Sequence, residues 1–188
     1  AIYRQPAVHL HADWCVNRWG RVIVTLDAHK DMAMPPLPRL GIMLPVERSM
    51  RHVTYYGYGP DESYIDKREH CYVDMFQAEV EDLHENYIRP QENGSHYHCR
   101  YVSLENEKYR LLAEADNYLD FNVSDYTVEE LAGKRHNFEL EPASGSLLSL
   151  DARMMGIGSN SCGPDLPEEF LRDEAHTVWK VQLQIEEL

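Results

Sequence analysis

The chain has 188 residues, of which 32 are acidic and 18 are Lys or Arg, and its formal net charge is −14. Nucleic acids and anionic membranes are bound through basic faces, so this charge argues against both as partners. A hydrophobic share of 43% is typical of a soluble globular protein, and no run of about 18 apolar residues predicts a membrane-spanning helix.

The amino terminus, AIYRQPAVHL, lacks a basic stretch followed by an apolar core, so no signal peptide is predicted. It also lacks a starting Met, which indicates a fragment or a processed product. We expect a cytoplasmic location. The cysteines form no CxxC pair and fit no zinc pattern. They are Cys15, Cys71, Cys99 and Cys162. Reduced thiols are the default expectation, and two disulfides are the alternative.

Most predicted elements are strands, because apolar and polar residues alternate with the period of two that marks a strand with one buried face. In chain order the alternating segments lie at 8–14, 21–28, 119–124, 137–140, 148–152 and 179–185. Turn residues at 17–20 predict a hairpin between the first two. Asn93-Gly94 predicts another turn, and 156–164, with three glycines and a proline, predicts a loop.

Helix signals are few. The run from Thr127 to Glu130 is a capping box and Gly133 is a stop, which together predict a helix of about two turns. Pro167 is a candidate start for one more short turn. Many short strands with few helices predict an all-β sandwich or barrel. The same pattern argues against a (β/α)₈ barrel, which needs long helices between parallel strands.

Two histidine pairs could bind a metal, because each spacing places both imidazoles on one face of a strand. These pairs are His9 with His11 and His96 with His98. The first pair lies on the polar face opposite Val8, so solvent exposure explains it, and the second has no obvious third ligand. We therefore predict no metal ligand in the chain.

Two other segments carry residues that suit binding. The loop at 155–165 combines small residues, polar tips and one cysteine after a predicted buried strand, and it is either a binding loop or a plain connection. The aromatic cluster at 55–60, followed by Tyr64, could stack on sugar rings. Core filling beside a tight turn, fixed by Gly57, Gly59 and Pro60, is the preferred interpretation.

Several motifs in a fixed order resemble the last domain of the large β-galactosidases of glycoside hydrolase family 2, called the β-galactosidase small-chain domain. The similar segments are Leu37-Pro-Arg-Leu-Gly41, Tyr56-Gly-Tyr-Gly-Pro-Asp-Glu-Ser-Tyr64 with Asp66-Lys-Arg68, Pro90-Gln-Glu-Asn-Gly94, Phe121-Asn-Val-Ser, Glu130-Leu131, His136-Asn-Phe-Glu-Leu140, and Asp151 with Met155-Gly-Ile-Gly158 and Ser161-Cys-Gly-Pro164. The resemblance covers roughly residues 7–188.

This resemblance implies an all-β antiparallel supersandwich like that of the galactose mutarotases. Residues 1–188 would be one domain, truncated at its amino-terminal end. Members of the family hydrolyse terminal β-D-galactosides such as lactose, with retention, through two glutamates on a (β/α)₈ barrel that this chain lacks. The chain is therefore not expected to be active alone. It would shape one side of the active-site pocket and support assembly.

The implied partners are the remainder of the β-galactosidase chain or a large subunit, the galactoside, and further copies in a homo-oligomer. No cofactor is expected in this chain, because the Mg²⁺ and Na⁺ that such enzymes often use bind outside this domain.

The implied site is a loop beside the substrate pocket. Its residues are Ser159, Asn160, Ser161 and Cys162. Many members have Trp where this chain has Cys162. A thiol offers no stacking face, so the loop either gives up its role as a sugar platform or lines a wider pocket. We do not expect Cys162 to be a nucleophile. Arg39 and Arg68 are expected to pair with carboxylates such as Glu62 or Asp66.

Two other functions remain open from the sequence. The chain could be the separate small subunit of a two-chain β-galactosidase. It could also be an independent carbohydrate-binding module or an aldose epimerase on the same fold. An epimerase needs an acid–base pair facing a cleft, and His136 with Glu139 is the candidate pair by residue type.

Overall fold

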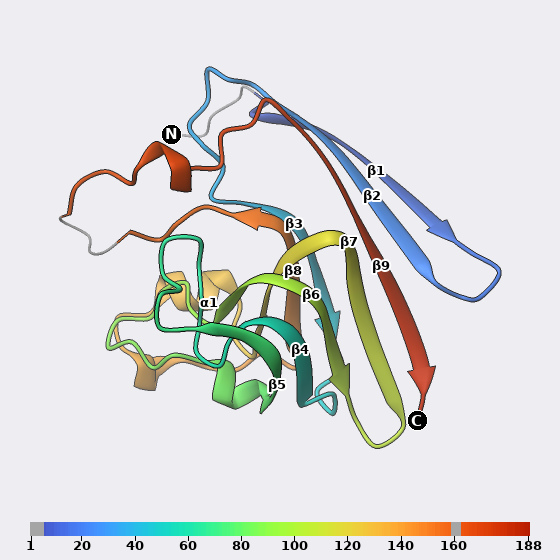
Figure 1. Cartoon of the computed structure of the whole chain (residues 1–188). Helices are drawn as coiled ribbons and strands as arrows, with labels where there is room; N and C mark the ends of the chain where they lie inside the picture. The colour runs from blue at the N-terminus through green and yellow to red at the C-terminus, as the bar shows by residue number, and fades with distance from the viewer. Residues whose placement is uncertain (1–5, 159–162) are drawn as a thin grey trace.

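The computed structural model describes residues 6–158 and 163–188, which form an all-β protein (Figure 1). The strands are β1 (Val8–Val16), β2 (Val22–Lys30), β3 (Arg39–Val46), β4 (His52–Gly59), β5 (Tyr72–Glu79), β6 (Ser95–Glu105), β7 (Tyr109–Ser124), β8 (Ser146–Met154) and β9 (His176–Glu187). The α-helix α1 spans Val128–Gly133, and three short 3-10 turns complete the described elements. No helix in these two ranges is long and apolar enough to cross a membrane.

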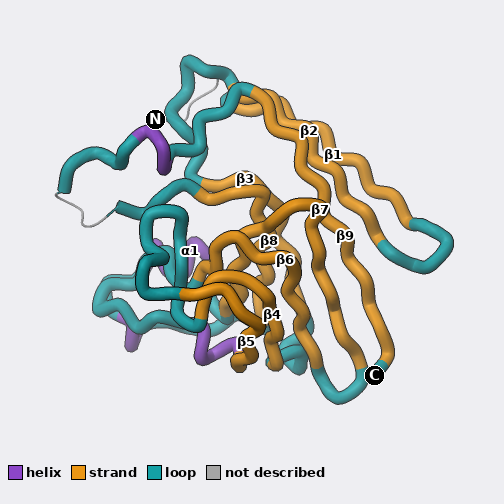
Figure 2. The backbone as a smooth tube through the Cα atoms, in the orientation of Figure 1, coloured by secondary structure: helices purple, strands orange, loops and turns teal. Residues whose placement is uncertain are grey.

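All the strand pairs are antiparallel, which confirms the predicted fold class. The main path of the sheet runs β1-β2-β9-β7-β6-β4-β5, and β8 joins β3 to β7. β7 is shared between two parts of the sheet. Its residues 109–115 pair with β9, and its residues 120–124 pair with β8. The arrangement, visible in Figure 2, is consistent with a β-sandwich, and the likeness to galactose mutarotases stays a prediction.

The core lies between these strands and is built from their alternating apolar residues. Its largest fully buried aromatic side chains are Tyr55, Tyr64 and Phe121. Tyr55 packs edge-on against Phe121, with ring centroids 5.0 Å apart. The burial of Tyr55 and Tyr64 supports the core-filling interpretation of the aromatic segment at 55–64.

Local signals in the sequence predicted several elements correctly. β1 and β2 form the hairpin, and Gly94 adopts φ +71°, as its turn requires. Helix α1 begins after Thr127, whose side chain accepts the N–H of Glu130 at 3.0 Å. A 3-10 turn, Glu168–Phe170, follows Pro167.

Two predictions were wrong. The segment predicted as a strand at 137–140 is a 3-10 turn, Asn137–Glu139, because the carboxylate of Glu139 accepts the N–H groups of Arg135 and His136. β1 has no buried face. Leu10 is 52% exposed and Trp14 57% exposed, because β1 is an edge strand beyond the reach of the core.

Candidate functional site

A cavity of about 590 Å³ lies beside the predicted binding loop. It is lined by Asp66, Lys67, Tyr87, Gln91, Ile157, Gly158, Pro164, Asp165, Leu166, Pro167 and Phe170. Ser159, Asn160, Ser161 and Cys162 lie outside the described residues. The segments on either side of them, at 157–158 and 164–167, are described and form part of the cavity wall. The predicted loop therefore begins and ends at this cavity.

Asp66 holds the start of that loop. Its carboxylate accepts the backbone N–H of Ile157 at 3.1 Å and that of Gly158 at 2.8 Å. A side chain at Gly156 would collide with it, since an added Cβ would lie 2.6 Å from the carboxyl carbon of Asp66. Asp66 thus joins the segment after β4 to the segment after β8, and the absence of a side chain at Gly156 permits the contact.

Beneath the cavity lies a buried carboxylate, Glu62, with four donors. Lys67 and the hydroxyl of Tyr87 both bond its Oε1. The backbone N–H of Gly94 bonds its Oε2 at 2.7 Å, and the hydroxyl of Tyr64 lies 3.5 Å from the same oxygen. Burial alone would raise the pKa of Glu62, but these hydrogen bonds outweigh it and hold that pKa below its usual range. Glu62 and Lys67 therefore form an ion pair at neutral pH. Because Lys67 and Tyr87 also line the cavity, the pair positions polar groups at its wall.

Arg39 forms a second ion pair, with the buried carboxylate of Asp151, close to the first. Its guanidinium makes a two-point contact with Asp151, at 3.2 and 2.5 Å, and lies 3.4 Å from Glu92. Burial opposes the charge of Arg39, but the hydrogen bond and charge of Asp151 keep the pKa of Arg39 above its ordinary value. The arginine thereby ties β3 to β8 and to the turn at 90–94.

The expected pairing with a carboxylate is confirmed for Arg39, but its named partners were wrong. Arg39 pairs with Asp151 and Glu92, and not with Glu62, whose cation is Lys67. Among the contacts of the described residues, Arg68 lies over an aromatic ring and not a carboxylate, with its guanidinium carbon 4.9 Å from the ring centre of Tyr97. The local spacing of these motifs did not reveal which residues meet in the fold.

Several of the motifs that carried the family resemblance nevertheless meet in one region. Those at 37–41, 56–68 and 90–94, together with Asp151 and the segment 155–158, are joined by the contacts of Asp66, Glu62 and Arg39 described above. Tyr87 lies outside every quoted motif, and no local pattern of residues predicts its place at the cavity. Lys67 lies inside a motif, but only the structure pairs it with Glu62.

The described wall of the cavity suits binding better than acid–base chemistry. Lys67 is held by Glu62, and the carboxylate of Asp66 already receives two N–H groups. Hydroxyl, amide and ammonium groups beside Ile157 and Phe170 present both polar and apolar surface. Such a mixture can receive the hydroxyls and the CH faces of a small polar ligand.

The other candidate residues do not form a second site. His136 and Glu139 are close, at 3.4 Å, but Glu139 caps the 3-10 turn and both side chains are partly exposed, so the pair has a structural role. The expectation that His96 and His98 share a face was wrong. A bulge between His96 and Cys99 breaks the alternation, so that His96 is buried against Tyr55 while His98 stacks on Tyr118.

The thiols also stay apart where the chain is described. Cys15, Cys71 and Cys99 are free, in agreement with the default expectation for these three residues.

Comparison with known proteins gives one consistent family. A family model for the beta galactosidase small chain matches residues 2–184. A beta-galactosidase of Actinobacillus pleuropneumoniae is 40% identical over 151 residues, which are 80% of this chain and 15% of that protein. One of Staphylococcus xylosus is 38% identical over 179 residues, 95% of this chain and 18% of that protein. One of Vibrio cholerae is 30% identical over 188 residues, 98% and 18% respectively. The chain thus spans 15 to 18% of the length of these relatives.

Proposed function

Because the chain belongs to the β-galactosidase small-chain family, we propose that it is one part of a larger β-galactosidase that releases terminal β-D-galactose from substrates such as lactose. The observation that carries this proposal is the meeting of several family-like motifs around the cavity beside the 155–165 loop. In this proposal the chain forms one wall of the substrate pocket, and the loop with Ser159, Asn160, Ser161 and Cys162 faces the sugar. Stereochemical retention would come from two glutamates elsewhere in the enzyme.

The wall formed by this chain would bind and orient the substrate. Lys67 and Tyr87 can contact hydroxyls, and the ion pair with Glu62 fixes their positions before the sugar arrives. A group held in place by a buried partner loses little conformational freedom on binding, which favours affinity. Asp66 acts on the loop that it holds, and it is a positioning residue in this proposal.

An exposed apolar strip on β1 is a candidate surface for contact with the rest of the enzyme. Leu10, Trp14 and Val16 are exposed on β1, yet the register places them on the same sheet face as the buried Val24 of β2. Contiguous exposed apolar surface at the edge of a core commonly marks an interface. We propose that the remaining polypeptide of the β-galactosidase covers this strip.

The test is to read the gene upstream of the codon for Ala1, express the complete enzyme, and measure kcat and KM for lactose. Removal of residues 1–188 should abolish activity, and the separately produced chain should restore part of it. Full activity without these residues would refute the proposal. If the reading frame begins close to Ala1, the same assay is run with the candidate large subunit.

A substitution in the complete enzyme tests the wall itself. Lys67→Met should raise KM for lactose about tenfold, the effect of losing one charged hydrogen bond of about 1.5 kcal/mol. Lys108→Met, at an exposed lysine of the β6–β7 turn, is the matched control and should leave KM unchanged. Equal KM values for the two variants would exclude Lys67 from the substrate pocket.

A further inference from the structure

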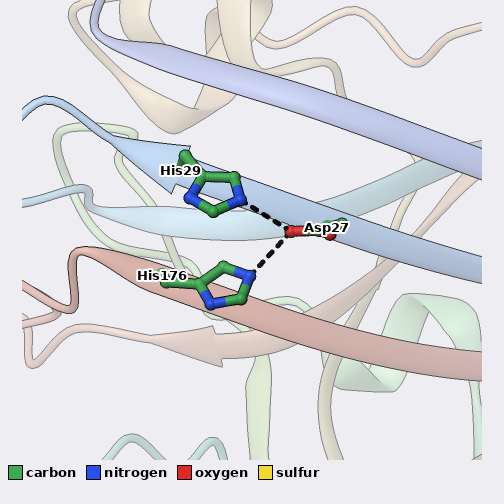
Figure 3. Close-up of side chains that lie close together, drawn as sticks. All are labelled: Asp27, His29 and His176. Carbon is green, nitrogen blue, oxygen red and sulfur yellow. Dashed lines mark hydrogen bonds and ion pairs between the residues drawn. The ribbon is translucent and has the colours of Figure 1, made fainter.

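Three side chains on the outer face of the sheet converge on one point, and none of them lines the cavity described above. Asp27 and His29 lie on β2, and His176 is the first residue of β9 (Figure 3). The register pairs His29 directly with His176. Residues opposite one another in an antiparallel pair share a face, as do alternate residues of one strand. All three side chains therefore project to the side opposite the buried Leu26 and Ala28.

The geometry brings their ligand atoms together. Oδ1 of Asp27 lies 2.8 Å from Nε2 of His176 and 3.2 Å from Nε2 of His29. The two imidazole rings are stacked, with centroids 4.1 Å apart and planes inclined by 7°. All three ligand atoms lie within 4.8 Å of one another. Both rings thus direct a nitrogen at the same carboxylate oxygen, and small side-chain rotations would place one ion among the three atoms.

We propose that Asp27, His29 and His176 bind a divalent transition-metal ion of the Zn²⁺ type. Two neutral imidazoles and a carboxylate are ligands that zinc accepts, with bond lengths of about 2.0–2.2 Å. The hard ions Mg²⁺ and Ca²⁺ prefer sets made of oxygen ligands, so the two nitrogens select against them. Binding releases any proton on the coordinating nitrogens to solvent, and no redox step is involved.

The neighbouring strand supplies further donors. On β1, His9 is paired with His29 and His11 is paired with Asp27, so both imidazoles lie on the same outer face. Opposite side chains in a ladder have Cβ atoms about 5 Å apart, which lets either histidine approach as a fourth ligand. Each of the three proposed ligands is between 44 and 62% exposed, so water can also fill an open position.

The charged groups further along this face are already paired. Lys180 of β9 lies 3.4 Å from the carboxylate of Asp116, and Asp13 of β1 lies 3.2 Å from His11, so no unpaired lysine or arginine in these contacts opposes a cation. The net charge of −14 adds a general attraction for divalent cations. The ion would connect β2 to β9, and so connect the β1–β2 hairpin to the rest of the sheet.

The sequence does not reveal this set, because its residues are far apart in the chain. Histidine pairs within one strand are visible as short spacings, but 149 positions separate Asp27 from His176. The pair His9 and His11 provides the neighbouring donors, and the closely spaced ligands come from β2 and β9.

The test is a calorimetric titration of the full chain, free of any histidine tag, with ZnCl₂ and separately with MgCl₂. We expect one Zn²⁺ per chain with a Kd of about 10 μM or lower, and no heat from Mg²⁺ at the same concentrations. Zn²⁺ should raise Tm, because an ion that binds only the folded chain stabilises it. Co²⁺ in place of Zn²⁺ should give the visible absorption of a tetrahedral site.

Substitutions identify the ligands. His29→Gln and His176→Gln should each weaken Zn²⁺ binding at least about tenfold. His136→Gln, at a partly exposed histidine that also lies beside a carboxylate, is the matched control and should bind as the unsubstituted chain does. Circular dichroism of the metal-free variants checks that each has folded, and two independent ligand variants keep the test decisive if one fails.

Three outcomes would overturn the proposal. They are the absence of Zn²⁺ binding up to about 1 mM, unchanged binding in both ligand variants, and loss of binding on substitution of His9 or His11 with none on substitution of His176. In the first case the two imidazoles and Asp27 form only a hydrogen-bonded cluster. β-Galactosidase activity plays no part in these readouts, so they are independent of the function proposed above.

Discussion

Asp66 accepts the backbone N–H of Gly158 at 2.8 Å, a contact that spans 92 positions of sequence. It is one of two N–H groups that this carboxylate receives, and together they fix where the 155–165 loop leaves the cavity. The shape of the proposed substrate wall therefore depends on a residue that need not touch the substrate.

Asp66→Asn should release the loop. An amide offers one acceptor oxygen where the carboxylate offers two, so one of the two backbone N–H groups loses its partner, at a cost of about 1 kcal/mol. Hydrogen exchange measured by mass spectrometry should become faster at Ile157 and Gly158. Asp74→Asn is the control, because Asp74 bonds only the adjacent N–H of Met75 among the described contacts. Unchanged exchange at 157–158 would show that the loop is held by other contacts.

Gly156→Ala should disturb the same contact from the other side. The new Cβ would lie 2.6 to 2.9 Å from the carboxyl atoms of Asp66, closer than carbon can approach, so the carboxylate has to move. We expect a fall in unfolding free energy of about 1–3 kcal/mol. Gly133→Ala, where an added Cβ meets nothing within 4 Å, should be neutral or slightly stabilising. Urea denaturation of the two variants gives the comparison, and equal midpoints would contradict the close approach.

Arg39→Met should be among the most destabilising single changes in the chain. It leaves the carboxylate of Asp151, which is 2% exposed, without its cation and deprives Glu92 of the same partner. Removing one member of a buried ion pair costs about 3–5 kcal/mol. Arg153→Met is the control, since its pair with Glu174 is partly exposed and should contribute less than about 1 kcal/mol. Similar denaturation midpoints for both variants would mean that the Arg39 pair is as weak as a surface pair.

Two buried groups should give the stability of the fold opposing pH dependences. Burial lowers the pKa of His96 to about 4, so between pH 4 and its ordinary value of 6.5 the unfolded chain binds more protons than the folded one. This contribution to stability is present above pH 6.5 and is lost as the pH falls. Burial raises the pKa of Asp120 to about 6, so over pH 3.8 to 6 the folded chain holds more protons, and stability falls as the pH rises.

Separate substitutions of His96 and Asp120 should distinguish their two contributions to the pH dependence of the unfolding free energy. Relative to the unsubstituted chain, His96→Gln lacks the contribution that rises with pH, so its unfolding free energy should fall by comparison from pH 4 to 6. Asp120→Asn lacks the contribution that falls with pH, so its unfolding free energy should rise by comparison over the same range. Each pKa unit corresponds to about 1.4 kcal/mol, so urea titrations at half-unit steps can resolve both differences. Differences of the same sign in the two variants would contradict the assignment.

Elements with a local cause were predictable from the sequence. The turn at 17–20, the cap at Thr127 and the start after Pro167 each depend on neighbouring residues, and the structure confirms them. The strand predicted at 137–140 was wrong. Two backbone N–H groups donate to the carboxylate of Glu139 and stabilise a turn there, and an alternation of only four residues is a weak strand signal. For β1 the predicted strand is present, and only its predicted burial was wrong. The residues do alternate, but burial depends on what covers the strand, and no described segment covers Leu10 or Trp14.

The candidate site was also predictable only in its local parts. The family-like motifs and the loop at 155–165 were recognisable, because each is a short segment of sequence. The contacts between these segments were not predictable, since Asp66 reaches Gly158 and Arg39 reaches Asp151 only through the pairing of distant strands. The bulge after His96 also has no simple sequence signal, and it reverses which side chains face the core.

The pairing of β2 with β9 joins two strands that are synthesised far apart in time. The only other neighbour of the β1–β2 hairpin in the described sheet is β9, whose His176 comes 149 positions after Asp27. Until β9 has been made, one edge of β2 is without its partner strand. Pairings so distant in sequence form slowly and leave edges open to wrong partners in the meantime. We expect β9 to close this part of the sheet, and chaperone contact before then to fall on β2.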